Sequence, residues 1–356
     1  MPTQVEKIRL LPPSEQNPRN SEGAFIQLND GRLLFVYSHY YDGGHDHSGA
    51  YLAGRYSADG GRTWGEDVTV LENEGACNVM SVSLLRMADG DIGMLYLRKD
   101  DPQKLCRAFL RRSSDEAKSW SDPVLSTVRH TYNVVNNDRV IRLSSGRLLI
   151  PTAIHHPPDQ AGAPYRPAVA TCFLSDDDGW IWEHAATELQ PPEESRTGLQ
   201  EPCIIELRDG RVMMLCRTDM GCHYRAYSAD GGVTWSEAEP TDLKTSCCSP
   251  ASIRRIPQTG DILIVYNRDA SDVSAEYEEV RSPLVTAISK DEGQTWEHHK
   301  WLEDDPGGWY CYTAIHFLED EDSVVLAYCA GRRQGDDFGG LALTQITRIP
   351  LQWLYS

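Results

Sequence analysis

One strand–turn–strand unit recurs six times along the chain, and this repeat constrains the fold more than any other feature. Each copy has an apolar run, a turn that usually contains glycine, and a second apolar run. Asp-Gly and Ser-Gly between β-rich runs favour hairpins, because glycine accepts a positive φ at little cost. The sequence therefore predicts β-hairpins at Ala24–Tyr37, Val82–Tyr96, Arg139–Ile150, Cys203–Cys216, Ala251–Tyr266 and Thr313–Tyr328.

A second unit, Ser-x-Asp-x-Gly-x-Thr-Trp, follows five of these hairpins. Its tryptophans lie 53 to 62 residues apart, at the period of the hairpins. Asp accepts backbone N–H groups in a tight turn, and Trp packs its ring between sheets. We therefore interpret this box as structural, with calcium binding or catalysis as the alternative. The copies are Ser57–Trp64, Ser113–Trp120 (without the Gly), Ser175–Trp182 (without the Thr), Ser228–Trp235 and Ser289–Trp296.

These two units together predict an all-β fold, a six-bladed β-propeller of four-stranded antiparallel blades in a single domain over residues 1–356. Six hairpins and five boxes leave one blade incomplete. We expect the N-terminal strand Val5–Leu11 and the C-terminal run Leu341–Ile349 to complete it jointly. Such closure removes the exposed strand edges that an open array would carry.

The charge of the chain excludes some classes of partner. The net charge is −19, which argues against a nucleic-acid phosphate surface and against anionic membranes. No run approaches the 18 apolar residues of a membrane span. The first residues lack the apolar run of a signal peptide, so we expect a cytoplasmic protein, or an exported one whose leader has been removed. The sequence leaves oligomerisation open.

Cysteine usage bears on the redox compartment. The chain has ten cysteines without a CxxC pair, and Cys247 and Cys248 are neighbours in the sequence. In a chain of this size we expect reduced, partly buried thiols rather than a disulfide framework.

The boxes and hairpins together resemble the sialidase (neuraminidase) superfamily over nearly the whole chain. Sialidases have a Glu before an inner strand and an Arg at the end of that hairpin, and Glu201-Pro202-Cys203 followed by Arg217 matches this pattern. The resemblance implies that Glu201 is the base that activates the nucleophile and that Arg217 binds a carboxylate. The alternative for Glu201 is a surface charge at a strand start.

Three further residues follow from the resemblance. Arg281 lies upstream of a boxed strand, where the family has a second carboxylate-binding arginine; the alternative is a loop cation. Tyr312 opens the strand of the last hairpin, where the family has its nucleophile, with Tyr310 as the alternative. Asp46, or else Asp42, occupies the loop of the family's acid/base aspartate.

No metal or organic cofactor is predicted. Histidines and aspartates crowd into residues 39–47, but one loop alone rarely builds a closed metal site. The resemblance implies chemistry that requires neither a metal nor an organic cofactor.

The sequence departs from the family at its first arginine. Sialidases have Arg-Ile-Pro at the first inner strand, whereas this chain has Arg19-Asn20-Ser21-Glu22, and Ser21 fills the aligned position. The arginine cluster is therefore either rebuilt by Arg19, Arg139 or Arg196, or reduced to two members. The polar run before the third hairpin supplies further substrate-binding candidates, Asn137, Asp138 and Arg139, with a structural turn as the alternative.

These resemblances imply a retaining exo-glycosidase that hydrolyses a terminal acidic sugar, sialic acid or a related ulosonic acid, through a tyrosine nucleophile. A hydrolase or lyase of the same fold that acts on a uronic acid or arabinose-type sugar is one alternative, motivated by the missing Arg-Ile-Pro. A non-catalytic carbohydrate-binding propeller is the other. In each case the expected partner is a carbohydrate.

Overall fold

The computed structural model describes residues 4–157, 166–245, 248–318, 321–332 and 339–356. The chain divides into two compact units, which we name the terminal unit (Met1–Glu72 with Thr245–Ser356) and the central unit (Asn73–Lys244). A single domain over residues 1–356 stays a prediction. Among the described residues, no helix is both long and apolar enough to span a membrane.

The terminal unit contains three four-stranded sheets whose neighbouring strands are antiparallel. The first has β2 (Arg19–Gln27), β3 (Leu33–Asp42), β4 (Gly49–Ser57) and β5 (Val68–Leu71) in order. The second has β19 (Ser252–Arg255), β20 (Ile262–Asn267), β21 (Leu284–Ser289) and β22 (Glu297–Glu303). The third has the order β1 (Glu6–Leu11), β25 (Thr344–Pro350), β24 (Ser323–Arg332) and β23 (Gly308–Leu318).

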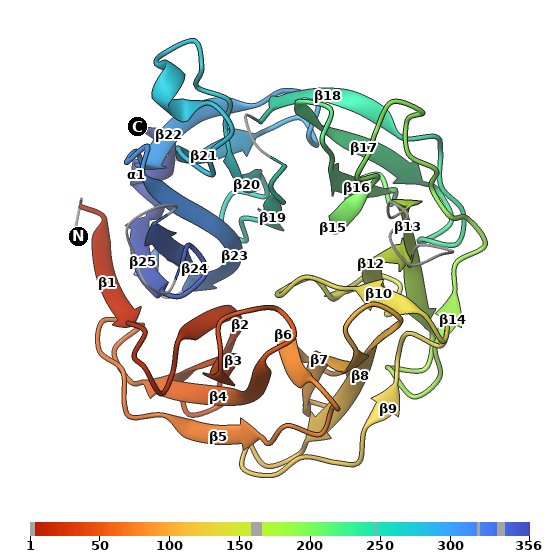
Figure 1. Ribbon diagram of the computed structural model, residues 1–356, viewed down its shortest axis with the longest axis vertical. Coiled ribbons are helices and arrows are strands. Elements are labelled where there is room, and N and C mark those ends of the chain that lie inside the picture. Colours follow the sequence, from red (N-terminus) through yellow and green to blue (C-terminus); the bar gives the residue numbers. More distant parts are fainter. Residues whose placement is uncertain (1–3, 158–165, 246–247, 319–320, 333–338) are drawn as a thin grey trace. The chain divides into compact units, whose positions relative to one another are not determined.

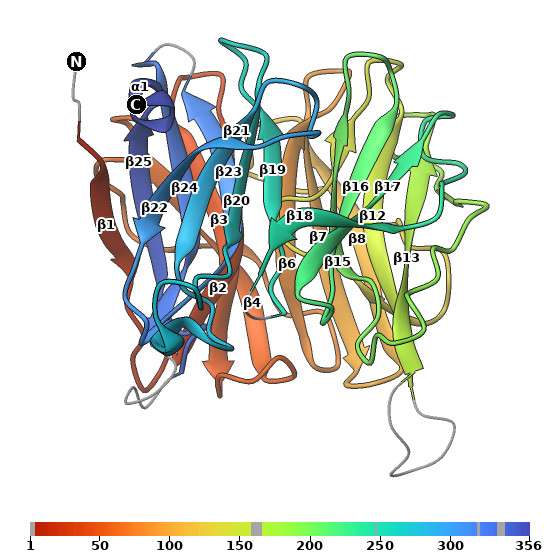
Figure 2. The same ribbon diagram turned by 90° about the horizontal axis from the view of Figure 1, so that it is seen from above.

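Both ends of the chain build the third sheet, as predicted. Strand β1 pairs antiparallel with β25, with Ile8 opposite Ile346 (Figure 1). Strands β25, β24 and β23 continue the sheet from there (Figure 2). The N-terminal strand therefore covers an edge that β25 would otherwise expose.

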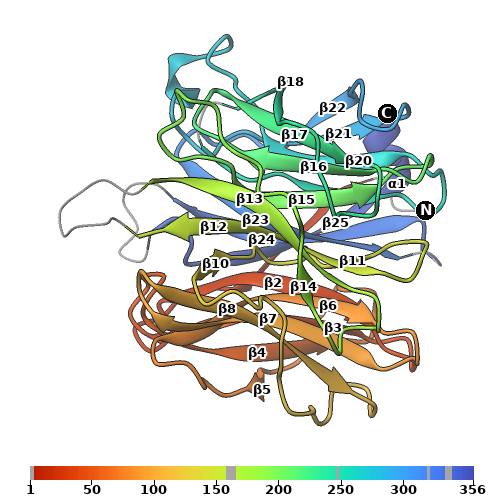
Figure 3. The ribbon, with the colours of Figure 1, turned by 90° about the vertical axis from the view of Figure 1, so that its right-hand side faces the viewer.

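The central unit contains one four-stranded sheet and one nine-stranded sheet. The first has β15 (Gln200–Glu206), β16 (Val212–Arg217), β17 (Cys222–Ser228) and β18 (Glu239–Lys244) in order (Figure 3). In the second, a parallel bridge between Tyr132 and Cys106 joins two groups of strands. One group is β6 (Asn78–Arg86), β7 (Ile92–Asp101), β8 (Leu105–Ser113) and β9 (Val124–Leu125); the other is β10 (Tyr132–Val134), β11 (Ile141–Arg142), β12 (Leu148–His156), β13 (Arg166–Ser175) and β14 (Glu183–His184).

Every predicted hairpin is an antiparallel pair in the structure. The pairs are β2–β3, β6–β7, β11–β12, β15–β16, β19–β20 and β23–β24. Their turn glycines have positive φ, for example 87° at Gly31 and 84° at Gly210. The prediction of six hairpins is confirmed, whereas the count of six blades stays a prediction, because two hairpins share the nine-stranded sheet.

Each box joins the last two strands of its sheet or group. In the first box Ser57 Oγ donates to Asp59 Oδ1 at 2.8 Å, and Asp59 accepts from the backbone and side chain of Thr63 at 2.8 and 2.6 Å. Burial opposes the charge of Asp59, but these hydrogen bonds outweigh it and lower the pKa of Asp59 to about 2. The same bonds from the box serine and from the backbone recur at Asp115, Asp177, Asp230 and Asp291. These contacts support the structural interpretation of the box.

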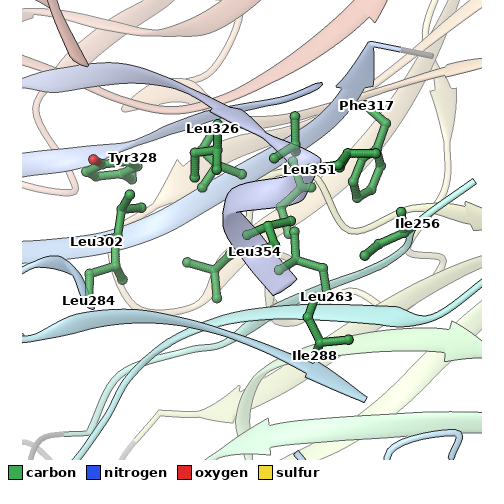
Figure 4. Close-up of a cluster of buried hydrophobic side chains, with 14 of the residues drawn as sticks. Ile256, Leu263, Leu284, Ile288, Leu302, Phe317, Leu326, Tyr328, Leu351 and Leu354 are labelled. Carbon is green, nitrogen blue, oxygen red and sulfur yellow. The ribbon is translucent and has the colours of Figure 1, made fainter. Parts of the chain in front are cut away.

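A large hydrophobic cluster lies between the second and third sheets of the terminal unit (Figure 4). Leu263 of β20, Leu326 of β24 and Leu354 of the short helix α1 (Leu351–Tyr355) are fully buried in it. Burial of each such side chain contributes about 2 to 3 kcal/mol. Strands β2, β6 and β15 are buried along most of their length. Their starts bury polar residues, among them Arg19, Asn78 and Glu201, and the candidate site includes such positions.

The described cysteines bear no disulfide. Nine of them are free, and Cys247 lies outside the described residues.

Candidate functional site

Several of the strands that open the predicted hairpins share an unusual backbone feature near their starts. In β2, β15 and β23 a β-bulge interrupts the register, and the bulge residue has a positive φ: 58° at Glu22, 40° at Glu201 and 61° at Tyr312. Ser81 in β6 and Asp138 before β11 are similar. Residues other than glycine rarely adopt this conformation, and such strain is concentrated at functional sites. The predicted base and the predicted nucleophile thus occupy corresponding positions of two different sheets.

In the terminal unit, Tyr312 lies beside Arg281. The guanidinium carbon of Arg281 is 5.4 Å from the ring centroid of Tyr312 and 5.0 Å from that of Trp309. Arg281 is buried, and its Nη2 donates to the carbonyl of Cys248 at 3.3 Å. Cation–π attraction favours this arrangement. The structure therefore brings together one predicted arginine and the predicted nucleophile, and it adds Trp309, which the sequence did not single out.

The alternative tyrosine has a different environment. Tyr310 is buried in the large hydrophobic cluster, with its ring centroid 6.5 Å from that of Tyr328. Burial raises the pKa of Tyr310 above its ordinary value. These contacts are those of a packing residue, which favours Tyr312 as the candidate nucleophile.

Arg19, the departure from the family motif, is enclosed at the start of β2. Its guanidinium forms ion pairs with Glu22 at 2.9 Å and with Asp46 at 2.6 Å, and it lies 4.5 Å from the ring centroid of Tyr40. Burial lowers the pKa of Arg19, but Tyr40, Glu22 and Asp46 outweigh this and hold that pKa well above its ordinary value. The structure brings Arg19 and Asp46 together, whereas Asp42 lies exposed at the end of β3.

Tyr40 connects this group with the candidate nucleophile. Burial raises the pKa of Tyr40 well above its ordinary value; Arg19 opposes this shift, and Glu22, Asp46 and Tyr312 add to it. Tyr40 lies opposite Arg19 in the register of β2 and β3. A buried phenol thus lies within electrostatic reach of both Arg19 and Tyr312.

In the central unit, Glu201 and Arg217 form a largely buried ion pair between Glu201 Oε2 and Arg217 Nη1. The register explains the contact, since Gln200 of β15 lies opposite Arg217 of β16. His155 of β12 is close enough for both charges to act on it. The pKa of His155 is lowered to about 4, chiefly by burial; Glu201 opposes this shift, and Arg217 adds to it. A neutral imidazole therefore adjoins this ion pair at neutral pH.

The polar run before β11 is tied to β6. The backbone N–H of Asp138 donates to the carbonyl of Val82 at 3.0 Å, and that of Arg139 donates to Ser83 Oγ at 2.8 Å. Asn137 and Arg139 are buried. These bonds support the structural role that was the alternative for this run, and a role in substrate binding stays a prediction.

Arg196, the remaining candidate for the arginine cluster, lies on the surface. Its side chain is 90% exposed and pairs with Asp219. Among the residues that the structure describes, no group of three His, Cys, Asp or Glu side chains is arranged to hold a metal ion.

The BNR repeat-like domain family matches residues 40–325 of the chain. The chain belongs to this family, within the sialidase superfamily. This BNR repeat protein is 25% identical over 340 residues to a sialidase of Bacteroides fragilis, a match that covers 85% of this chain and 58% of that protein. The chain thus spans little more than half the length of that curated relative.

Solved structures agree with this assignment. The leech intramolecular trans-sialidase has a TM-score of 0.75 at 15% identity, over 99% of this chain and 71% of that one. A protein of unknown function from Dyadobacter fermentans has a TM-score of 0.72 at 19% identity, over 98% of this chain and all of that one. The predicted fold class is therefore confirmed: the BNR repeat protein has the β-propeller fold of the sialidases.

Two sets of site residues have been described, one in each unit. Tyr312, Arg281, Arg19 and Asp46 belong to the terminal unit, and Glu201, Arg217, Arg139, Asn137 and Asp138 belong to the central unit. Glu22, Tyr40, Trp309 and His155 are additions from the structure. A strained bulge marks Glu22 in the structure, but no sequence signal marks any of the four.

Proposed function

We propose that this protein is a glycoside hydrolase of the sialidase type that removes a terminal acidic sugar, sialic acid or a related ulosonic acid, with retention of configuration. The observation that carries the proposal is the buried guanidinium of Arg281 beside the ring of Tyr312. The family assignment and the Bacteroides fragilis sialidase support it. The leech trans-sialidase, whose structure was solved with 2,7-anhydro-Neu5Ac, supports the choice of sugar.

The choice of a tyrosine nucleophile follows from the chemistry of the sugar. The anomeric carbon of an ulosonic acid bears a carboxylate, which repels an anionic Asp or Glu nucleophile. A neutral phenol avoids this repulsion, and sialidases are the glycosidases that use one. In the proposed mechanism Glu201 takes the proton of Tyr312 as its oxygen bonds to the anomeric carbon.

The remaining roles are assigned to the charged side chains. Arg281 and Arg217 bind the substrate carboxylate through charge-assisted hydrogen bonds. Asp46 donates a proton to the leaving oxygen as the glycosidic bond breaks. In the second step Asp46 takes a proton from water, whose oxygen bonds to the anomeric carbon as the bond to Tyr312 breaks, and Glu201 returns its proton to the tyrosine oxygen.

A trapping experiment tests the proposal. A 2,3-difluoro derivative of the acidic sugar should label Tyr312, and mass spectrometry of the digested protein locates the adduct. Tyr312→Phe should abolish labelling and lower kcat by at least about 1,000-fold, since the covalent path is lost. Tyr310→Phe is the matched control and should retain both the labelling and the kcat of the wild type. Unchanged turnover in Tyr312→Phe would refute the proposal.

Recognition of the carboxylate has a separate test. Arg281→Lys keeps the charge but loses the planar fork, so KM for an acidic sugar should rise about 10- to 100-fold. A KM that does not change would exclude Arg281 from carboxylate binding.

A second candidate is hydrolysis or elimination at another sugar, such as a uronic acid or an arabinoside. The enclosure of Arg19 by Glu22 and Asp46 favours it, because this arginine already pairs with two carboxylates of its own chain. Turnover of aryl sialosides, uronides and arabinosides by the same preparation distinguishes the two candidates.

A further inference from the structure

Arg19 has most of its hydrogen-bonding capacity satisfied within its own chain. An arginine carries five N–H donors. Four hydrogen bonds leave Arg19: Nε to Ser21 Oγ at 2.9 Å, Nη1 to Gly44 O at 3.3 Å and to Asp46 Oδ1 at 2.6 Å, and Nη2 to Glu22 Oε2 at 2.9 Å. A ligand carboxylate would have to displace one of these acceptors to form a paired interaction with this guanidinium.

The Arg19–Asp46 pair joins a buried group to an exposed one. The side chain of Arg19 is 2% exposed, and that of Asp46 is 58% exposed. Gly44 and Asp46 both belong to the loop between β3 and β4, so two of the four bonds hold this loop. Arg19 itself begins β2, whose pairing with β3 fixes its position. A rigid strand thus anchors a loop carboxylate that faces solvent.

The other two bonds keep Arg19 in place. Glu22 is buried in the bulge of β2 and neutralises the guanidinium, and Ser21 Oγ donates to Glu22 Oε2 at 2.9 Å. Tyr40 covers the guanidinium at 4.5 Å. Because Glu22 already balances its charge, Arg19 is stable in the interior and also holds Asp46 through a short charge-assisted bond.

We propose that Arg19 is a positioning residue for the acid/base carboxylate of Asp46 and does not bind the carboxylate of the substrate. This inference rests on the proposed function. A general acid must lie within hydrogen-bond reach of the oxygen that it protonates. Arg19 holds Asp46 through Oδ1, so the pairing of β2 with β3 determines the position of the carboxylate. Recognition of the substrate carboxylate then depends on the other arginines.

Substrates with different leaving groups distinguish positioning of Asp46 from binding of the substrate carboxylate. An aryl glycoside such as a 4-nitrophenyl glycoside leaves with little help from an acid, whereas an alkyl glycoside of the same sugar needs protonation. Arg19→Lys keeps the charge and loses the fork that holds Gly44 and Asp46. We expect kcat/KM to fall at least about 100-fold for the alkyl glycoside and less than about 10-fold for the aryl glycoside, with KM unchanged.

Two comparisons complete the kinetic test. Asp46→Ala should reproduce the selective loss on the alkyl glycoside, and adding Arg19→Lys to it should cause no further loss. Arg32→Lys, the same substitution at an exposed arginine outside the candidate site, should change kcat/KM for neither substrate. An equal fall on both substrates with a raised KM would show that Arg19 binds the substrate, and it would overturn the inference.

Amide hydrogen exchange tests the anchor without turnover. Two variants break the contact: Arg19→Lys, and Asp46→Ala, which leaves the buried Arg19–Glu22 pair intact. In both, amides of residues 43–48 should exchange at least about 10-fold faster, while those of β3 and β4 stay unchanged. Equal exchange in Asp46→Ala and wild type would overturn the inference. If the wild type cleaves neither glycoside but the variants exchange faster, the proposed function is refuted. The role of Arg19 in holding the loop of Asp46 would still be supported.

Discussion

The buried histidine of β17 gives the protein a pH-dependent stability that can be measured. His223 is 1% exposed. Burial lowers the pKa of His223 to about 4; Arg217 also lowers it, and a backbone hydrogen bond at Cys216 opposes the shift. An unfolded histidine titrates near pH 6.5. Between about pH 6.5 and pH 4 the unfolded chain therefore binds a proton that the folded chain does not, and stability falls with pH in that window.

The shift in the pKa of His223 determines how much the free energy of unfolding changes with pH. A difference of about 2.5 pKa units corresponds to about 3.4 kcal/mol when the titration is complete, at roughly 1.4 kcal/mol per unit. Between pH 7 and pH 5 the linkage gives about 2 kcal/mol. His223→Gln keeps an N–H donor and removes the titration. The free energy of unfolding in urea should therefore fall by about 2 kcal/mol more in the wild type than in His223→Gln between these pH values.

Comparing the pH dependence of the unfolding free energy in the wild type and in His223→Gln isolates the contribution of His223. His155 also has a lowered pKa, and it contributes equally to both proteins. Substitution of the exposed His45 by Gln is the control, and this variant should follow the wild-type profile. Parallel profiles for the wild type and His223→Gln would refute the assignment of a depressed pKa to this side chain.

Two further substitutions and one deletion test the fold. Gly232 has φ of 90°, and an added Cβ would meet Leu149 at 2.9 Å, so Gly232→Ala should cost about 2 to 4 kcal/mol in urea unfolding. Gly210→Ala, with φ of 84° and open space, should cost only about 1 kcal/mol. Deletion of β1 removes two buried leucines and exposes the edge of β25, which should lower Tm and produce oligomers on size exclusion. Equal costs for the two alanines, or a monomer with an unchanged Tm after the deletion, would contradict these expectations.

The hairpins and the boxes could be predicted because local residues determine them. The Asp-Gly turn at Gly210 requires a positive φ wherever it occurs, and Asp59 forms its hydrogen bonds within a few residues of itself. Completion of the last sheet by β1 followed from counting units, since one group of strands lacked a box.

The environment of each charged side chain could not be predicted in the same way. Whether Arg19 is open to a ligand depends on Tyr40 and Asp46, which reach it through the pairing of β2 with β3 and through a loop. The bulges gave no sequence signal, because Glu22, Glu201 and Tyr312 differ in chemistry and share only a backbone conformation. Sequence patterns report the periodicity of a strand, whereas a bulge is an interruption of it.

The pairing of β1 with β25 also sets an order of events during synthesis. Thr344 follows Leu11 by 333 residues, so at about 5 to 20 residues per second the partner of β1 is made roughly 20 to 70 s after β1 itself. During that interval the first strand is open to pairing with other nascent chains. Its charged residues Glu6, Lys7 and Arg9 disfavour such encounters, as charges do on natural edge strands. The strand that completes the last sheet is therefore synthesised before the other strands of these sheets and is among the last to be paired.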